Sequence, residues 1–219
     1  MALIRQWREK EAAILVEEAR KTLNQGQVVA LPTDTFYALA VHPFQEEALA
    51  RLAALKGRGW QKPFLLLVSG PEILSQVVKE IPETARILLK HFWPGPLTLI
   101  LPARSGLSRY LTGGHGGVGV RWPRQKVLCR LIAALGHPVT GTSANRAGEP
   151  ALIRADDVAR VFGGEVSLIW DVGPCPGGRP STVLDLTCRP PRVLRKGAVD
   201  LTEIQAIIQD VDPKVMTHG

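Results

Sequence analysis

Apolar residues along this chain alternate between helical spacing and short unbroken runs. Near the N-terminus, Ile14, Leu15, Ala19 and Leu23 fall close to one stripe at helical spacing. This pattern predicts an amphipathic helix over residues 8–24, within a charged N-terminal segment. The same reasoning predicts further helices at 46–56, 71–79, 82–91, 125–135, 156–162 and 201–209.

Short apolar runs between these helices predict strands. They occupy residues 28–31, 64–68, 97–101, 118–121, 139–141, 168–171, 182–186 and 192–194. Unbroken apolar strands are typical of a sheet that is covered on both faces, and here helices separate only some of the strands. We therefore expect a single α/β domain over 1–219: an open, twisted, mixed β-sheet flanked by helices, with a core at about 10–200 and a C-terminal helix and frayed tail at 201–219. Loops are predicted at 113–119 and 174–181, where glycine and proline gather.

Composition narrows the class of protein. The chain has 219 residues, of which 45% are hydrophobic and 21% charged, as in an ordinary globular protein. It has no apolar run of the roughly 20 residues that a membrane span needs, and its N-terminus does not resemble a signal peptide. We therefore expect a cytoplasmic protein with no membrane partner. The three cysteines, at 129, 175 and 188, form no C-x-x-C motif and are expected to be inert thiols.

The net charge of +7 suggests an anionic partner, such as a nucleic acid, a nucleotide or phosphate. The basic residues are spread along the chain without a polybasic tail, and aromatic residues make up only 5%. A single-strand binder with stacking platforms would want more aromatic residues.

Two segments place hydroxyl groups directly after predicted strands. In PTDTFYALA, residues 32–40, Thr33 and Thr35 flank an aspartate. In VTGTSANRAGEP, residues 139–150, a run of hydroxyl residues (Thr140, Thr142 and Ser143) is followed by Asn145. Each segment could be a simple turn, because these side chains hydrogen-bond their own backbone. Each could also bind an anion through hydroxyls and successive backbone N–H groups.

Cations occupy the ends of other predicted elements. The candidates are Lys56, Arg58 and Lys62 in LKGRGWQKPF, Arg121 in VGVRWPRQ, and Arg195 in VLRKGA; Ser181 opens a further strand in GGRPSTVLDL. Each could be a solvated surface group or a cation at a helix C-terminus. In open α/β sheets, however, ligands bind outside the strand ends, so together these loops predict a basic concave groove. We find no Cys–His pair, H-E-x-x-H motif or Ser–His–Asp spacing, so we expect neither a covalent nucleophile nor a protein-held metal.

The order of these motifs resembles one family. PTDTFYALA, KGRGWQKP, FWPGPLTLIL, GVGVRWP, TSANRAG, STVLDL and VLRKGAV follow the order seen in the YrdC-type threonylcarbamoyl-AMP synthase family, over roughly residues 10–200. The resemblance implies a YrdC-like fold in its short, single-domain form. It also implies formation of threonylcarbamoyl-AMP and pyrophosphate from L-threonine, bicarbonate or CO2, and ATP with Mg²⁺. A downstream complex then transfers the threonylcarbamoyl group to adenosine 37 of ANN-decoding tRNAs, and tRNA or double-stranded RNA is a further candidate partner.

The resemblance also assigns residues to substrates. For L-threonine it implies contacts from Thr33, Thr35, Arg121, Gly141 and Ser181. For ATP it implies contacts from Lys56, Arg58, Lys62, Ser143, Asn145 and Arg195. Magnesium is expected to be held mainly by ATP.

Two departures from the family pattern bear on the substrate. The usual histidine four residues after the K-P proline is Leu67 here, and the usual Y-G-L-G reads Y-A-L-A, with Ala38 and Ala40. Two other functions therefore stay open. One is an RNA-binding or translation-associated module without synthase activity, and the other is a related carbamoyl-adenylate enzyme that uses another amine. Because Lys56 and Arg58 of the K-x-R signature and Ser143 and Asn145 of the S-x-N signature are present, the synthase is favoured.

Overall fold

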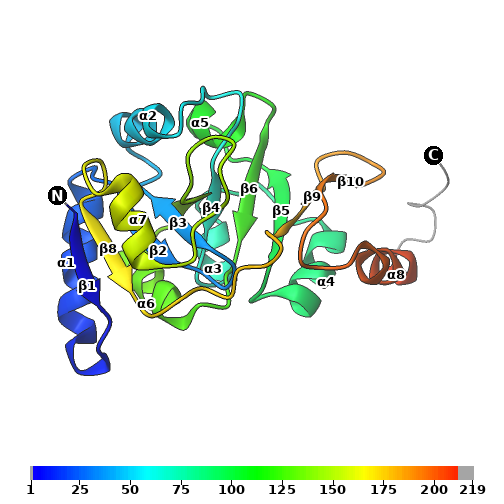
Figure 1. Ribbon diagram of the computed structural model, residues 1–219. Helices are drawn as coiled ribbons and strands as arrows, with labels where there is room; N and C mark the ends of the chain where they lie inside the picture. Colours follow the sequence, from blue (N-terminus) through cyan, green and yellow to red (C-terminus); the bar gives the residue numbers. More distant parts are fainter. Residues whose placement is uncertain (1, 212–219) are drawn as a thin grey trace.

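Ten strands form one mixed sheet in the computed structural model, which describes residues 2–211 (Figure 1). In chain order the strands are β1 (Leu3–Gln6), β2 (Val29–Pro32), β3 (Tyr37–Ala40), β4 (Leu65–Leu67), β5 (Leu97–Pro102), β6 (Gly117–Arg121), β7 (Val139–Ser143), β8 (Leu168–Asp171), β9 (Thr182–Asp185) and β10 (Arg192–Arg195). Their order across the sheet is β1-β8-β2-β3-β7-β4-β6-β5-β9-β10. Parallel and antiparallel neighbours both occur, so the prediction of a mixed sheet is confirmed.

Helices pack around this sheet. They are α1 (Ala12–Asn24), preceded by a 3-10 turn at Glu9–Glu11, and α2 (Glu46–Leu55), α3 (Pro71–Leu74), α4 (Glu83–Phe92), α5 (Arg109–Thr112), α6 (Lys126–Leu135), α7 (Ala155–Phe162) and α8 (Leu201–Val211). Helix α1 packs against α6, and α8 packs against α4 beyond the β9–β10 end of the sheet (Figure 1). No helix within residues 2–211 has the length and apolarity needed to cross a membrane.

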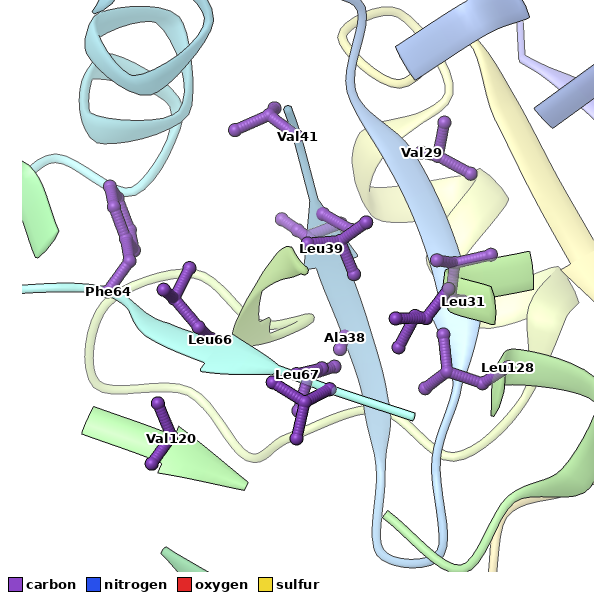
Figure 2. Packing of buried hydrophobic residues seen from close by; sticks show 14 of the residues in the cluster. Val29, Leu31, Ala38, Leu39, Val41, Phe64, Leu66, Leu67, Val120 and Leu128 are labelled. Atoms are coloured by element: carbon purple, nitrogen blue, oxygen red, sulfur yellow. The ribbon is translucent and has the colours of Figure 1, made fainter. Parts of the chain in front are cut away.

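The core lies between the central strands and their helices. Leu31, Leu39 and Leu66 come from β2, β3 and β4 and are fully buried, and Figure 2 shows them in one cluster with Phe64 and Leu128. Burying each such side chain contributes roughly 1.5–3 kcal/mol to folding. The polar turn between β2 and β3 is therefore attached to strands that lie in the core.

The N-terminal segment differs from the sequence prediction. Residues 3–6 form an edge strand that pairs in parallel with β8, and the helix begins only at Ala12. Its buried face consists of Leu15, Ala19 and Leu23, spaced four residues apart, whereas Ile14 is 70% exposed and was wrongly placed in the buried stripe. A four-residue strand whose partner lies more than 160 residues away leaves no local signal.

Three other elements also differ. Strand β3 was not predicted, because Tyr37–Ala40 directly follows a turn and reads as part of it. The short helix α5 was missed, and the predicted loop 113–119 becomes strand from Gly117. The predicted helix 71–79 ends at Leu74, because Val78 forms an isolated β-bridge with Ala103. The predicted tail falls on residues 212–219, outside the described part of the chain.

Candidate functional site

The turn between β2 and β3 is built around Thr33. Its hydroxyl accepts hydrogen bonds from the backbone N–H groups of Thr35 at 3.1 Å and Phe36 at 3.2 Å, and donates to the Phe36 carbonyl at 2.7 Å. The two threonine hydroxyls lie 3.1 Å apart. Thr33 therefore stabilises a turn through its own backbone neighbours, which is one of the two interpretations of PTDTFYALA. Both threonines also line a cavity of about 530 Å³, so the turn and the candidate site coincide.

Arg121 lies at the end of β6 and lines the same cavity. Its Nη2 donates to the Asp34 carboxylate, Nε donates to the Gly95 carbonyl at 3.2 Å, and Nη1 donates to the Thr35 hydroxyl at 3.4 Å. Burial lowers the pKa of Arg121 and the Asp34 charge opposes that change, but an arginine keeps its proton in either case. Three of the five N–H donors are thus used. One N–H on each terminal nitrogen has no partner in the described part of the chain and is left for a ligand, as a fork for two carboxylate oxygens requires.

Lys56 and Asn145 organise the loop after β7. Lys56 Nζ donates to the Ser143 carbonyl and to Asn145 Oδ1, both at 2.9 Å, and also to the Asn145 carbonyl. Ser143 Oγ donates to Asn145 Oδ1 at 2.7 Å, and Asn145 Nδ2 donates to the Glu149 carbonyl at 2.7 Å. Burial, together with the neighbouring Arg58 and Arg146 charges, lowers the pKa of Lys56 to about 8. Ser143 lines the cavity, whereas Lys56 and Asn145 lie behind the loop.

Arg58 follows α2 and lies in the cavity wall. Its guanidinium stacks on the Phe64 ring, 4.3 Å from the ring centre. Its Nε is buried and has no hydrogen-bond partner among residues 2–211. Lys62 is exposed and does not line the cavity.

Gly141 on β7 and Leu67 on β4 form a tightly packed part of the wall. A Cβ placed on Gly141 would lie 2.6 Å from Leu67 Cγ and 2.7 Å from Cδ1. Glycine is required here for close packing. Leu67 is buried and presents an apolar surface to the cavity, next to Ala38 of β3, as in Figure 2.

Ser181 and Arg195 form another part of the wall. Arg195 Nε donates to the Ser181 carbonyl at 3.0 Å, and Nη2 donates to Ser181 Oγ at 2.9 Å. Ser181 Oγ also lies 2.9 Å from the hydroxyl of Thr98, a residue of β5 that is 1% exposed. Burial lowers the pKa of Arg195, and the charge of Arg121 lowers it further, so the two cations act on each other.

The structure brings most of the predicted site residues together. Those that line the cavity are Thr33, Thr35, Arg58, Arg121, Gly141, Ser143, Ser181 and Arg195. Lys56, Lys62 and Asn145 do not line it, and their contacts with ATP stay predictions. Thr142, which belongs to the hydroxyl run singled out in the sequence, also lines the cavity, and sequence reasoning missed Tyr37 and Thr98, which line it as well. Thr98 had one signal: it is a lone hydroxyl inside an apolar strand.

The charged residues that line the cavity are all arginines, set among hydroxyl groups. Such a cavity suits a ligand that carries carboxylate or phosphate groups. Within residues 2–211, no three His, Cys, Asp or Glu side chains gather as metal ligands. Burial raises the pKa of the Cys175 thiol to about 11, so this thiol is protonated at neutral pH.

Known proteins similar to this chain belong to the family that the order of its motifs resembles. The family model Sua5_yciO_yrdC, described as "Telomere recombination", matches residues 21–197. Threonylcarbamoyl-AMP synthase of Pyrococcus abyssi is 38% identical over the whole chain, which spans 64% of that relative. A putative threonylcarbamoyl-AMP synthase of Mycobacterium leprae is 34% identical over 88% of this chain and 87% of its own length. The crystal structure of P. abyssi Sua5 complexed with L-threonine matches with a TM-score of 0.88 and 38% identity, covering 95% of this chain and 61% of that one.

Proposed function

Because the chain belongs to the Sua5/YciO/YrdC family, we propose that it is a threonylcarbamoyl-AMP synthase. It would join L-threonine, bicarbonate or CO2, and ATP into threonylcarbamoyl-AMP and pyrophosphate. The observation that carries this proposal is the convergence of Arg58, Arg121 and Arg195 with several hydroxyl groups in one cavity. All three substrates carry or acquire anionic oxygens, which such a cavity binds.

The amino-acid subsite is proposed around Arg121. Its two remaining N–H donors would hold the threonine carboxylate, with Thr35 and Ser181 as neighbouring hydroxyls. Thr33 would shape the turn and Gly141 would line the pocket beside Leu67. The similar P. abyssi Sua5, which has been crystallised with L-threonine, supports an amino-acid subsite in this fold.

The ATP subsite is proposed around Arg58 and Ser143. The guanidinium of Arg58, which stacks on Phe64 in the cavity wall, would donate to a phosphate oxygen, and Arg195 would add a second cation. Lys56 and Asn145 would act through the Ser143 loop, and Lys62 would contact phosphate from outside the cavity. Magnesium would arrive with ATP and offset the charge of its phosphates, since the charged residues that line the cavity provide no carboxylate ligand.

The chemistry then requires positioning and charge stabilisation. Bicarbonate supplies CO2 and hydroxide. The neutral amine of threonine attacks CO2, and its proton combines with the hydroxide, so that a carbamate and water form. A carbamate oxygen attacks the α-phosphorus of ATP, the bond to the β-phosphate oxygen breaks, and pyrophosphate leaves. Oriented cations stabilise the charge that builds up, so no protein nucleophile is needed. We further propose that the product is passed, in the cytoplasm, to the complex that modifies adenosine 37 of tRNA.

Pyrophosphate release tests this proposal. The protein is incubated with MgATP and bicarbonate, with and without L-threonine, and then with serine and other amines. We expect release that requires threonine and bicarbonate together. Release with a different amine would retain the chemistry and change the substrate, which Leu67 makes worth testing. A folded protein that releases no pyrophosphate with any amine would contradict the proposal and favour the RNA-binding alternative, whose affinity should fall steeply with salt.

Variants sharpen the assay. Arg58→Ala and Ser143→Ala should each lower turnover strongly. Loss of one cation that is oriented toward the reacting groups should lower the turnover rate about 100-fold or more. Arg86→Ala is the matched control, because Arg86 is an exposed arginine of α4 outside the cavity. Circular dichroism would check that each variant is folded. Near-normal turnover in both site variants would contradict the site assignment.

A further inference from the structure

Thr98 is a buried hydroxyl in the cavity wall that the proposed chemistry has not yet used. Its strand β5 pairs in parallel with β9, with Leu97 opposite Thr182 and Thr98 opposite Val183. The Thr182 N–H donates to the Pro96 carbonyl at 3.0 Å. The sheet register thus fixes Thr98 Oγ1 at 2.9 Å from Ser181 Oγ, and both residues line the cavity.

The Thr98 and Ser181 hydroxyls together leave one hydrogen for a hydrogen bond to a ligand. The pair has two hydroxyl hydrogens, and only one can lie between the two oxygens. Arg195 donates to Ser181 Oγ, which fills one of the acceptor positions of Ser181. Within the described chain, neither hydroxyl has another acceptor, so the second hydrogen is free for the cavity.

We propose that Thr98 is a positioning residue that donates to Ser181 Oγ and so fixes the Ser181 hydroxyl as a hydrogen-bond donor toward the ligand. With Arg195 and Thr98 both donating to it, Ser181 has its two lone pairs filled. Its own O–H then points to an acceptor in the cavity. Networks of this kind hold each hydroxyl in one orientation.

This proposal rests on the proposed function and makes its amino-acid subsite more specific. A donor-only Ser181 can meet an oxygen of the amino acid or of its carbamate, but it cannot accept from an ammonium group. Arg195 beside it favours the same polarity, because it is a fixed cation. This part of the cavity therefore selects a carboxylate-type oxyanion and leaves the amine free to react.

A double-mutant cycle tests the proposal. Thr98→Val removes the hydroxyl and keeps the shape, and Thr98→Ser keeps the donor. The binding of L-threonine without ATP is measured by calorimetry, and KM and kcat by pyrophosphate release. We expect Thr98→Val to weaken threonine binding and raise KM roughly tenfold, about the size of one hydrogen bond, and Thr98→Ser to restore most of it. In a Ser181→Ala background, Thr98→Val should have almost no effect, because its action passes through Ser181.

Thr140→Val is the matched control. Thr140 is also a fully buried sheet threonine, but its hydroxyl accepts from the Val41 N–H and lies outside the cavity lining. The Thr140→Val variant should have a lower free energy of unfolding and nearly the same KM for threonine. Equal effects of Thr98→Val with and without Ser181, or unchanged threonine binding, would overturn the proposal, as would a folded wild type that does not bind threonine. A wild type that binds threonine but releases no pyrophosphate would contradict the proposed function alone.

Discussion

The side chains of Asp34 and Arg121 form an ion pair that is almost closed off from solvent, with 14% and 6% of their areas exposed. Asp34 belongs to the turn after β2, and Arg121 ends β6, so the pair joins two strands that are not neighbours in the sheet. It balances the charge of the cation that we assign to the substrate carboxylate.

Asp34→Ala should therefore be strongly destabilising. It would leave a buried arginine without its counter-charge, which typically costs about 3–5 kcal/mol. The free energy of unfolding is measured with urea. Asp157→Ala is the matched control, because Asp157 pairs with an arginine on the surface of α7, where a pair contributes roughly 0–1 kcal/mol. Equal losses in the two variants would show that the Asp34–Arg121 pair has no special role.

Lys56→Met should affect ATP more than stability. Methionine keeps a long side chain but removes the N–H groups that hold the Ser143 and Asn145 loop. We expect a rise in KM for ATP of roughly tenfold, because the loop loses its fixed position. Lys90→Met on the exposed face of α4 is the control and should leave KM unchanged. An unchanged KM in Lys56→Met would mean that this lysine does not position the site.

Gly141→Ala should be destabilising through overpacking against Leu67. The added methyl group would lie within 3.0 Å of three Leu67 side-chain carbons, and such insertions cost about 1–3 kcal/mol. Adding Leu67→Ala should make the Gly141→Ala change much less costly, which urea unfolding of both singles and the double variant measures. Gly164→Ala, where a methyl group meets nothing within 4 Å, is the control. Additive losses would contradict this packing account.

The fold could be predicted where a segment carries its own signal. Three predicted helices lie near their predicted bounds: those at 46–56, 82–91 and 125–135. Each segment has an apolar face at helical spacing. Strand β1 could not be predicted, since it is held by β8 and not by its own pattern. Strand β3 could not be predicted for another reason. Its four residues are all buried, but they directly follow a polar turn and show no alternation of their own.

The site also contains residues that the sequence identifies and relationships that only the fold determines. Arg58, Arg121 and Arg195 could be named because cations at strand and helix ends are visible in a sequence. The resemblance did not distinguish residues that line the cavity from those that hold the loop behind it, such as Lys56 and Asn145. That distinction, and the pairing of Thr98 with Ser181, depends on strand register.

His42 should make the protein acid-sensitive. Burial, together with the charge of His137, whose ring centre lies 4.1 Å away, lowers its pKa to about 4. Because the folded state favours the neutral ring, this contribution to stability is fully present above pH 6.5 and is lost as the pH falls toward 4. We expect the wild type to lose about 1–3 kcal/mol more than His42→Gln between pH 6.5 and 4. Parallel pH curves for the two proteins would contradict this.

The central claim is that one cavity joins threonine, bicarbonate and ATP. The most direct test is mass spectrometry of the nucleotide product formed from L-threonine, MgATP and ¹³C-bicarbonate. The account predicts a threonyl adduct of AMP whose carbamoyl carbon carries the label and which is lost in Arg58→Ala. An AMP adduct without the label, or no adduct from a folded protein, would contradict the account.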